Sequence, residues 1–451
     1  EYVDFITNYY GEGSKAWNLL GWKKRDADGN PLKEFGTYDT DWQNEIYRTG
    51  VNHDHNITLQ GGVQAEDKSV FAMPYRVSVG YTGQQGILKG SDYKRLTASV
   101  NLNPSFLDNH LTFNMNGKFV KSWTKPGNGE AIGAAVGMDP TQPIKDMENP
   151  KFKNYGGYFQ WVQEAEYGNP NWGYTHQQGP KNAVELVNNY GFDKDAWVFM
   201  GNVDAAYKIH GLEDLSLHVN LAGEWTNGQE NTYQSPYSMS GYYYGSYGWN
   251  TEEKQNLQLS AYAAYDKEFN KNHSLNVMAG YEWSKFQYMG REKFWGYYPE
   301  GDRKYNADPA QNIYDPTGYP EDGKPWGNRL YMVSWFGRAN YSYKGKYLLT
   351  ATLRADGSSN FAPNKQWGYF PAAAAAWRIS EEGFMKDIEY IDNLKLRVGW
   401  GQTGNSGNMT GRAVAALSGD AAYNFYPAGG HAGAFGGNRD RLTGWYAGLV
   451  D

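Results

Sequence analysis

Apolar and polar residues alternate along much of this chain, and the alternation is clearest between residues 330 and 401. At residues 333–343 every second side chain is apolar or absent, and mostly polar ones fall between them. A period of two is the pattern of a β-strand that has one apolar face. The segment 344–346 reads as a tight turn, and the alternation resumes at 347–355, so the two segments are predicted to form a hairpin.

The same alternation predicts about a dozen strands, each of about ten residues. Besides that hairpin they lie near residues 75–81, 96–102, 111–119, 203–209, 215–225, 257–265, 275–283, 367–378 and 394–400. Tilted strands of this length can cross a bilayer, and the apolar face ends in Trp and Tyr, as a lipid-facing surface does. We therefore expect an all-β fold, namely a transmembrane antiparallel β-barrel.

Short turns and long loops are expected to alternate strictly. The long loops are predicted at residues 122–195, 227–253 and 285–329, and the short turns lie near Pro104, Gly211, Asn270, Gly345 and Glu381. Outer-membrane barrels have short periplasmic turns and long extracellular loops. This pattern predicts that the long loops face the exterior.

Composition supports the membrane interpretation. Aromatic residues reach 16%, with 38 Tyr and 17 Trp, while cysteine is absent and the formal charge is -7. No apolar run approaches the roughly 18 residues of a membrane helix, and mean hydropathy is only -0.76. A barrel explains both the many aromatic residues and the low hydropathy without a long apolar run, because only alternate residues face lipid. The mild acidity argues against nucleic acid as a partner.

Several ordered motifs resemble the SusC/RagA family of TonB-dependent outer-membrane transporters of Bacteroidetes. They lie at residues 336–341, 347–359, 367–371, 377–382 and 394–397, and a weaker likeness covers 40–48 and 55–62. The resemblance implies active import of an oligosaccharide or peptide. A SusD-like surface lipoprotein would capture the cargo, and the TonB–ExbB–ExbD complex would supply energy through a plug domain.

The resemblance also sets the expected domain organisation. Residues 1–52 would be an extracellular segment at the barrel entry, 53–403 barrel strands and 404–451 a region without a confident strand. Importers of this type enclose a plugged lumen with 22 strands, so the chain would supply about half a barrel. We expect a fragment, with the signal peptide and plug upstream and further strands downstream.

Aromatic rings in the long loops are the candidate ligand-binding residues. A flat ring packs on the apolar face of a sugar, and nearby amides and carboxylates bind hydroxyls. Packing of the loops on one another, or a grip on a partner, is the alternative role. The candidates are Tyr158, Trp161, Trp172, Tyr243, Trp249 and Trp295, and the inward strand residues expected to face the plug are Arg338, Arg354 and Arg397.

Other motifs do not indicate catalysis, a metal or a cofactor. Residues 26–37 begin like a calcium loop but have Pro31 where Gly is required and Thr37 where Glu is required. His53 and His55 lack a third ligand. Residues 399–404 match a dinucleotide fingerprint, but no helix can follow. We therefore expect no enzyme activity.

Two other classes of protein stay open. A passive porin would share the strands and lack a plug. A soluble β-protein that binds glycans would also be rich in Tyr and Gly, but its outward positions would be charged where this chain has Val, Leu and Ala.

Overall fold

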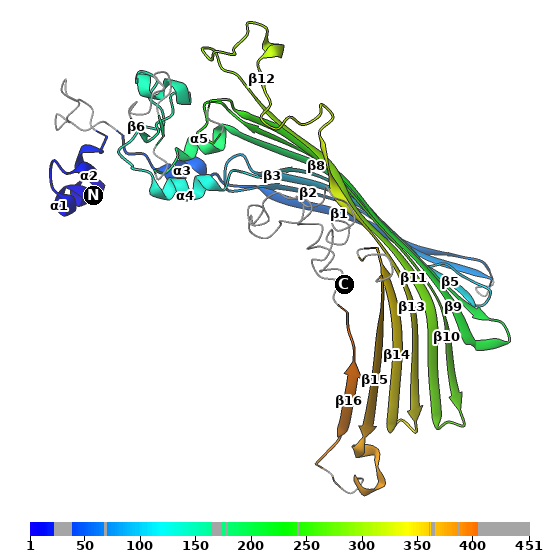
Figure 1. Cartoon of the computed structure of the whole chain (residues 1–451). Helices are drawn as coiled ribbons and strands as arrows, with labels where there is room; N and C mark the ends of the chain where they lie inside the picture. The colour runs from blue at the N-terminus through cyan, green and yellow to red at the C-terminus, as the bar shows by residue number, and fades with distance from the viewer. Residues whose placement is uncertain are drawn as a thin grey trace, which may run out of the picture.

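The computed structural model describes residues 1–21, 38–66, 70–163, 174–175, 179–240, 243–359, 361, 366–385, 388 and 390–404. Most of them form one sheet in which each strand pairs antiparallel with the next along the chain. Twelve strands make this path (Figure 1): β1 (Asn52–Gln64), β2 (Phe71–Gln85), β3 (Asp92–Leu102), β5 (Leu111–Lys125), β8 (Tyr190–Ile209), β9 (Leu212–Gln234), β10 (Ser246–Phe269), β11 (His273–Tyr297), β13 (Lys324–Tyr343), β14 (Tyr347–Ser358), β15 (Trp367–Arg378) and β16 (Lys395–Gly401).

Of four shorter strands that the structure describes, two pair with this sheet, β4 (Ser105–Phe106) and β12 (Ile313–Tyr314), and two pair with each other, β6 (Val162–Gln163) and β7 (Tyr174–Thr175). An up-and-down antiparallel order with a strong common twist is that of a barrel wall, and Figure 1 shows the sheet curving along its length. The expected all-β, antiparallel barrel architecture is confirmed.

The turns that join the strands at one end explain the hairpin register. Lys344 and Gly345 have φ of 51° and 65°, and Asn270 and Lys271 have 51° and 61°. Two successive residues with positive φ make the mirror-image turn whose twist suits the flanking strands. Tyr343 accordingly pairs with Tyr347, as the sequence predicted.

The strands are longer than the sequence predicted. Strands β8 to β11 and β13 contain 20 to 25 residues, so the predicted loops 122–195, 227–253 and 285–329 shrink to 126–189, 235–245 and 298–323. Backbone pairing continues where polar and aromatic residues are mixed on the two faces, and there the alternation of apolar residues no longer marks a strand. Strict alternation of long and short connections is also wrong, because residues 86–91 make a short connection at the long-loop end.

Helices gather at the long-loop end of the sheet (Figure 1). Helices α3 (Trp42–Ile46), α4 (Glu130–Gly137), α5 (Ala183–Asn188) and the 3-10 helix η1 (Pro150–Tyr155) surround one apolar core, and we call this unit the cap. Leu88, from the connection between β2 and β3, packs into the same core. The cap is therefore built from three segments that are far apart in the sequence.

A second, smaller helical unit precedes the cap. Helices α1 (Tyr2–Tyr10) and α2 (Lys15–Asn18) pack around Ile6, Trp17 and Leu20. The described residues also form short 3-10 helices, η2 (Pro309–Gln311), η3 (Ile379–Glu381) and η4 (Gly383–Met385). The last two lie in the short turn expected near Glu381. Among the described residues, no helix is long and apolar enough to cross a membrane.

Candidate functional site

The two faces of the sheet differ in chemistry. One face, which we call the outer face, carries an apolar band that includes Leu217, Val219, Leu221, Leu349 and Leu353. All five side chains are exposed. Such a surface is stable only against lipid or another apolar surface. The opposite, inner face carries polar side chains at the intervening positions, as the wall of a transmembrane barrel does.

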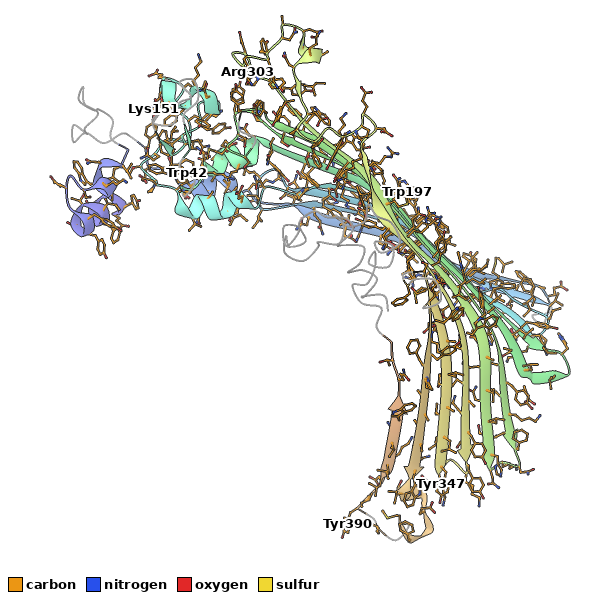
Figure 2. The ribbon with its side chains drawn as sticks, in the orientation of Figure 1. Trp42, Lys151, Trp197, Arg303, Tyr347 and Tyr390 are labelled. Atoms are coloured by element: carbon orange, nitrogen blue, oxygen red, sulfur yellow. The ribbon has the colours of Figure 1, made fainter. Side chains whose placement is uncertain are left out.

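Aromatic rings border this apolar band at both ends. Toward the short turns lie Tyr207, Tyr265, Tyr341, Tyr343, Tyr347 and Trp377, and toward the cap lie Trp197, Phe199, Trp225, Trp283, Trp335 and Tyr369. Figure 2 labels Tyr347 near the turn end of the sheet and Trp197 nearer the cap. Rings at both borders are the two girdles of a membrane-spanning barrel, which we call the lower and upper girdles.

The lower girdle is tied to the short turns by hydrogen bonds. The Tyr347 hydroxyl donates to Glu382 Oε1 at 2.7 Å, and the Trp377 indole N–H donates to the same oxygen at 3.1 Å. The first of these bonds is the main reason that the pKa of Glu382 lies below its usual value. The polar tips of interfacial rings therefore point away from the apolar band, toward the aqueous side.

The cap encloses a buried polar frame as well as its apolar core. The Trp42 indole N–H donates to the Asp139 carbonyl at 2.9 Å, and Asn182 Nδ2 donates to the carbonyls of Ile144 and Phe159. Asn182 Oδ1 also caps the N-terminus of α5 by accepting from the backbone N–H groups of Val184 and Glu185. Buried amides that are satisfied in this way hold the cap in one arrangement.

Glu185 is a fully buried acid in the cap. Burial raises the pKa of its carboxyl, although hydrogen bonds from Ser238 and Asn189 and the nearby Lys181 act in the opposite direction. Ser238 belongs to the connection between β9 and β10. Glu185 thus joins the cap to this neighbouring connection.

The structure places two of the predicted loop rings inside the cap. Tyr158 is only 5% exposed, its hydroxyl accepts from Asn188 Nδ2 at 3.1 Å, and the Lys145 ammonium lies 4.1 Å from the centre of its ring. Trp161 packs against the same core and meets Phe159 edge-on at 5.0 Å. Both rings are therefore packing residues of the cap in this structure. Trp172 and the calcium-like segment 26–37 lie outside the described residues.

Tyr243 joins the connection 235–245 to the connection 298–323. Its hydroxyl donates to Asp302 Oδ2 at 2.7 Å, while the adjacent Tyr244 stacks on Tyr314 with ring centres 3.9 Å apart. Asp302 has a lowered pKa, first because the backbone N–H of Lys304 donates to it and next because of Tyr243. Burial raises the pKa of Tyr244. These rings hold connection 235–245 against connection 298–323.

Trp249 and Trp295 are not loop residues, which corrects the sequence prediction. Trp249 lies in β10 opposite Lys293, and Trp295 lies in β11 opposite Tyr247. Both are half-buried and lie on the outer face, beyond the upper girdle. Tyr247 stacks near Trp295 at 6.2 Å and meets Tyr297 edge-on at 5.0 Å. The two tryptophans belong to an aromatic cluster on the outer face of the sheet, at the end that carries the long connections.

The three predicted arginines lie on the inner face. Arg354 makes ion pairs with Asp356 at 2.7 Å and Glu282 at 3.2 Å, and it donates to Ser334 Oγ at 2.8 Å. Arg338 lies opposite Thr352 in the next strand, and Arg397 lies opposite Ala376. For the described residues, ion pairs of Arg338 and Arg397 are not seen. Their inner-face position agrees with the sequence prediction, and contact with a plug stays a prediction.

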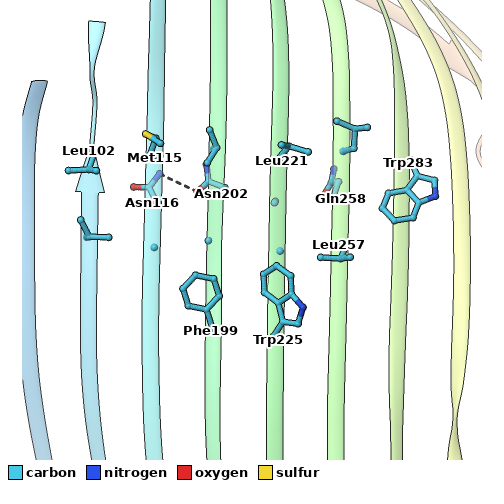
Figure 3. A pocket seen from close by; sticks show the side chains of 17 residues that line it. Leu102, Met115, Asn116, Phe199, Asn202, Leu221, Trp225, Leu257, Gln258 and Trp283 are labelled. Atoms are coloured by element: carbon cyan, nitrogen blue, oxygen red, sulfur yellow. Dashed lines mark hydrogen bonds between the residues drawn. The ribbon is translucent and has the colours of Figure 1, made fainter. Parts of the chain in front are cut away.

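The inner face also carries a polar surface that the sequence analysis did not single out. Asn116, Asn202 and Gln258 occupy inner positions on β5, β8 and β10, and the Asn116 amide donates to Asn202 Oδ1 at 3.2 Å (Figure 3). On the outer side of β5, β8 and β9, Gly117, Gly201 and Gly223 leave a hollow beside Phe199 and Trp225. The alternation contained the signal for these amides, since each lies between two apolar or glycine positions.

The described residues contain no cluster of three or more His, Cys, Asp or Glu side chains that could hold a metal ion. His53 and His55 lie on the outer face of β1 with ring centres 5.3 Å apart. This geometry agrees with the interpretation of the two histidines as strand residues.

No family model matches the chain, but individual proteins do. It is 39% identical over 408 residues to the TonB-dependent receptor SusC of Bacteroides thetaiotaomicron, covering 88% of this chain and 38% of that protein. The TonB-dependent receptor P3 of Formosa agariphila is 28% identical over 82% of this chain and 34% of its own length. The chain thus spans little more than a third of these relatives.

Solved structures share the fold. The RagAB peptide importer in its closed-closed state aligns with a TM-score of 0.61 and 17% identity, over 90% of this chain and 44% of that chain. The apolar band on the outer face and this shared fold define an outer-membrane β-barrel of the TonB-dependent receptor class. Within that class the chain belongs with the SusC/RagA-like receptors of Bacteroidetes, as its motifs indicated. SusC, P3 and RagAB are receptors or importers by name.

Proposed function

We propose that the full-length protein imports an oligosaccharide or a peptide actively across the outer membrane. The observation that carries the proposal is the combination of a lipid band bordered by two girdles with a polar inner wall. The 39% identity to a TonB-dependent receptor supports energy coupling through TonB–ExbB–ExbD. A plug domain in another part of the protein would carry that coupling.

The same proposal includes a SusD-like surface lipoprotein as partner. The cap and the connections 235–245 and 298–323 lie at one end of the sheet. We expect this end to face the exterior, because outer-membrane barrels have short turns in the periplasm and long connections outside. They form an ordered extracellular surface, because the cap has its own buried core and Tyr243 joins the two connections. Such a surface suits a partner that captures cargo outside the cell.

We also propose that Trp249 and Trp295 are the predicted rings available to a ligand or to the lipoprotein. They are half-buried, whereas Tyr158 is enclosed by the cap and the hydroxyl of Tyr243 is bound to Asp302. Alanine at both tryptophans should weaken uptake or lipoprotein co-purification while the barrel level in the outer membrane stays normal. Unchanged values of both measurements would assign the pair to packing.

The test of import uses the complete gene in a host from which it has been deleted. Growth is measured on single neutral glycans and single peptides as carbon source, with and without deletion of exbB. Active import predicts that growth on at least one cargo requires both the gene and exbB. Uptake that requires the gene but survives the loss of exbB would instead indicate the passive porin.

A further inference from the structure

The outer face has a hollow of about 540 Å³ just inside the upper girdle (Figure 3). Gly117, Gly201 and Gly223 form its floor, because the strand register places these residues side by side on β5, β8 and β9. The rings of Phe199 and Trp225 border it toward the long connections. A Cβ atom added to Gly223 would lie 2.5 Å from the Trp225 ring, so the hollow exists because these positions lack side chains.

The surroundings of the hollow are aliphatic. Leu221, Leu257 and Leu259 lie beside the glycines on the same face. In an outer-membrane barrel this face meets acyl chains. A recess surrounds an acyl chain on several sides and so makes more dispersion contacts with it than a flat wall does. The hollow is therefore suited to one ordered chain.

Two cations lie beside the hollow, on the side of the girdle where the headgroups of the lipids lie. Lys285 follows Trp283 by two residues on the outer face of β11 and pairs with Leu257, which lines the hollow. Arg329 lies on β13 opposite Gln287, so it is a diagonal neighbour of Lys285. Diagonal neighbours have Cβ atoms roughly 7 to 8 Å apart. These two long side chains, which we call the rim cations, can therefore contact one phosphate group.

The rim cations lack a carboxylate partner among the described residues. Lys285 Nζ donates to the amide oxygen of Gln255, and Arg329 Nη2 lies 3.8 Å from Met289 Sδ. Glu253 lies opposite Met289, one step further toward the long connections, and in the described part of the chain it forms no ion pair with either cation. The positive charge of the rim cations is thus not neutralised within this sheet.

Two other cations of the outer face are already paired. Lys121 makes an ion pair with Asp195, and Arg291 makes one with Asp322. The rim cations differ from them because their charge is available to an anion. They also lie next to the upper girdle, and interfacial rings mark the level of the lipid headgroups. An anionic headgroup at this level gains binding energy from each nearby Lys or Arg.

We propose that the hollow and the rim cations bind one phosphorylated lipid with several acyl chains, a lipid of the lipid A class. One chain lies in the hollow, and a headgroup phosphate lies between Lys285 and Arg329. The predicted orientation gives the outer leaflet, because the site lies toward the long connections. Gly223 and Lys285 are separated by β10 and thus by roughly 10 Å, which favours a broad headgroup over that of a two-chain phospholipid.

The first test concerns the charge and uses the full-length protein in mild detergent. Native mass spectrometry records the binding of three probes: lipid A with one phosphate, the same lipid A after removal of the phosphate, and phosphatidylglycerol. The rim variant carries Lys285→Gln with Arg329→Gln. Its control carries Arg291→Gln with Lys293→Gln, which removes the same charge from the outer face of β11 but further from the apolar band.

The second test concerns the hollow. Gly117→Leu fills it from β5. The control, Gly337→Leu, fills another outer-face hollow of about 640 Å³, which has no Lys or Arg in its lining. The rim variant changes only surface side chains, so it tests the site even where a glycine variant does not fold.

The expected result is that the wild type binds phosphorylated lipid A in preference to the other two probes. The rim variant should bind it about tenfold more weakly, because two cations near the phosphate are lost. Gly117→Leu should show a similar loss, and both controls should bind as the wild type does. Equal binding of lipid A with and without phosphate, equal binding by the rim variant, or preference for phosphatidylglycerol would overturn the proposal.

Discussion

The environment of a single side chain in this protein depends on the face of the sheet on which it lies. In β14, Leu349, Ala351 and Leu353 lie on the outer face, while Thr350 and Thr352 lie on the inner face and pair with Asn340 and Arg338. Ala351 pairs with Ala339 and Ala373, halfway between the two girdles. Neighbouring residues of one strand therefore meet either hydrocarbon or a polar lumen.

The first prediction tests this difference. Ala351→Arg should destabilise the full-length barrel by about 2 to 4 kcal/mol, because the guanidinium would enter the middle of the lipid band. Thr352→Arg places the same group on the polar inner face and should cost much less. Urea-induced unfolding in lipid vesicles gives both values. Equal losses at the two positions would show that the faces have been assigned wrongly.

The second residue-scale prediction concerns Glu185 and pH. Its raised pKa means that the folded cap holds a proton which the unfolded segment loses near pH 4.5. The stability contribution of this group is thus fully present below pH 4.5 and is lost as pH rises through the folded pKa. Glu185→Gln should remove this dependence and stabilise the cap by on the order of 1 kcal/mol at pH 7.

Hydrogen exchange of α5 between pH 5 and 8 measures the effect in the full-length protein. Glu45→Gln, an exposed change on α3, serves as the control and should leave the profile unchanged. A wild-type cap whose protection does not fall with rising pH, after correction for the intrinsic exchange rate, would contradict the prediction.

At the scale of whole elements, the lengths of the turns and connections predict the orientation of the sheet in the membrane. The turns at 210–211, 270–272 and 344–346 have two or three residues, whereas the connections at the other end include the cap and the segment 298–323. Long strands carry the sheet well beyond the apolar band, so the long connections start far from that band. The outward residues Lys285, Gln287, Arg291 and Lys293 of β11 mark this aqueous extension.

The third prediction tests the orientation. Arg303 lies exposed in the connection that carries β12, and Tyr390 is 97% exposed. Figure 2 shows the two residues at opposite ends of the sheet. Arg303→Cys in the full-length protein should react with an impermeant maleimide on intact cells. Tyr390→Cys should react only after the outer membrane is broken. Labelling of Tyr390→Cys on intact cells would reverse the assigned topology.

Across the whole molecule, strand order follows directly from the sequence. Each strand pairs with the next one along the chain, so local turns are sufficient to specify the neighbours. The positions of the predicted site residues followed from the sequence only in part. The three arginines lie on the expected face, but Trp249 and Trp295 lie in strands, because the strands continue into segments without an apolar alternation.

The sequence by itself determined the antiparallel barrel class, the apolar face and the hairpin turns, because a period of two and positive-φ turn residues are local properties. Tertiary structure alone decided which residues become buried in the cap, since Trp42, Leu88 and Leu186 meet only after distant segments come together. It also decided the outer-face hollow. Gly117, Gly201 and Gly223 lie side by side only in the register of three strands, which no single strand encodes.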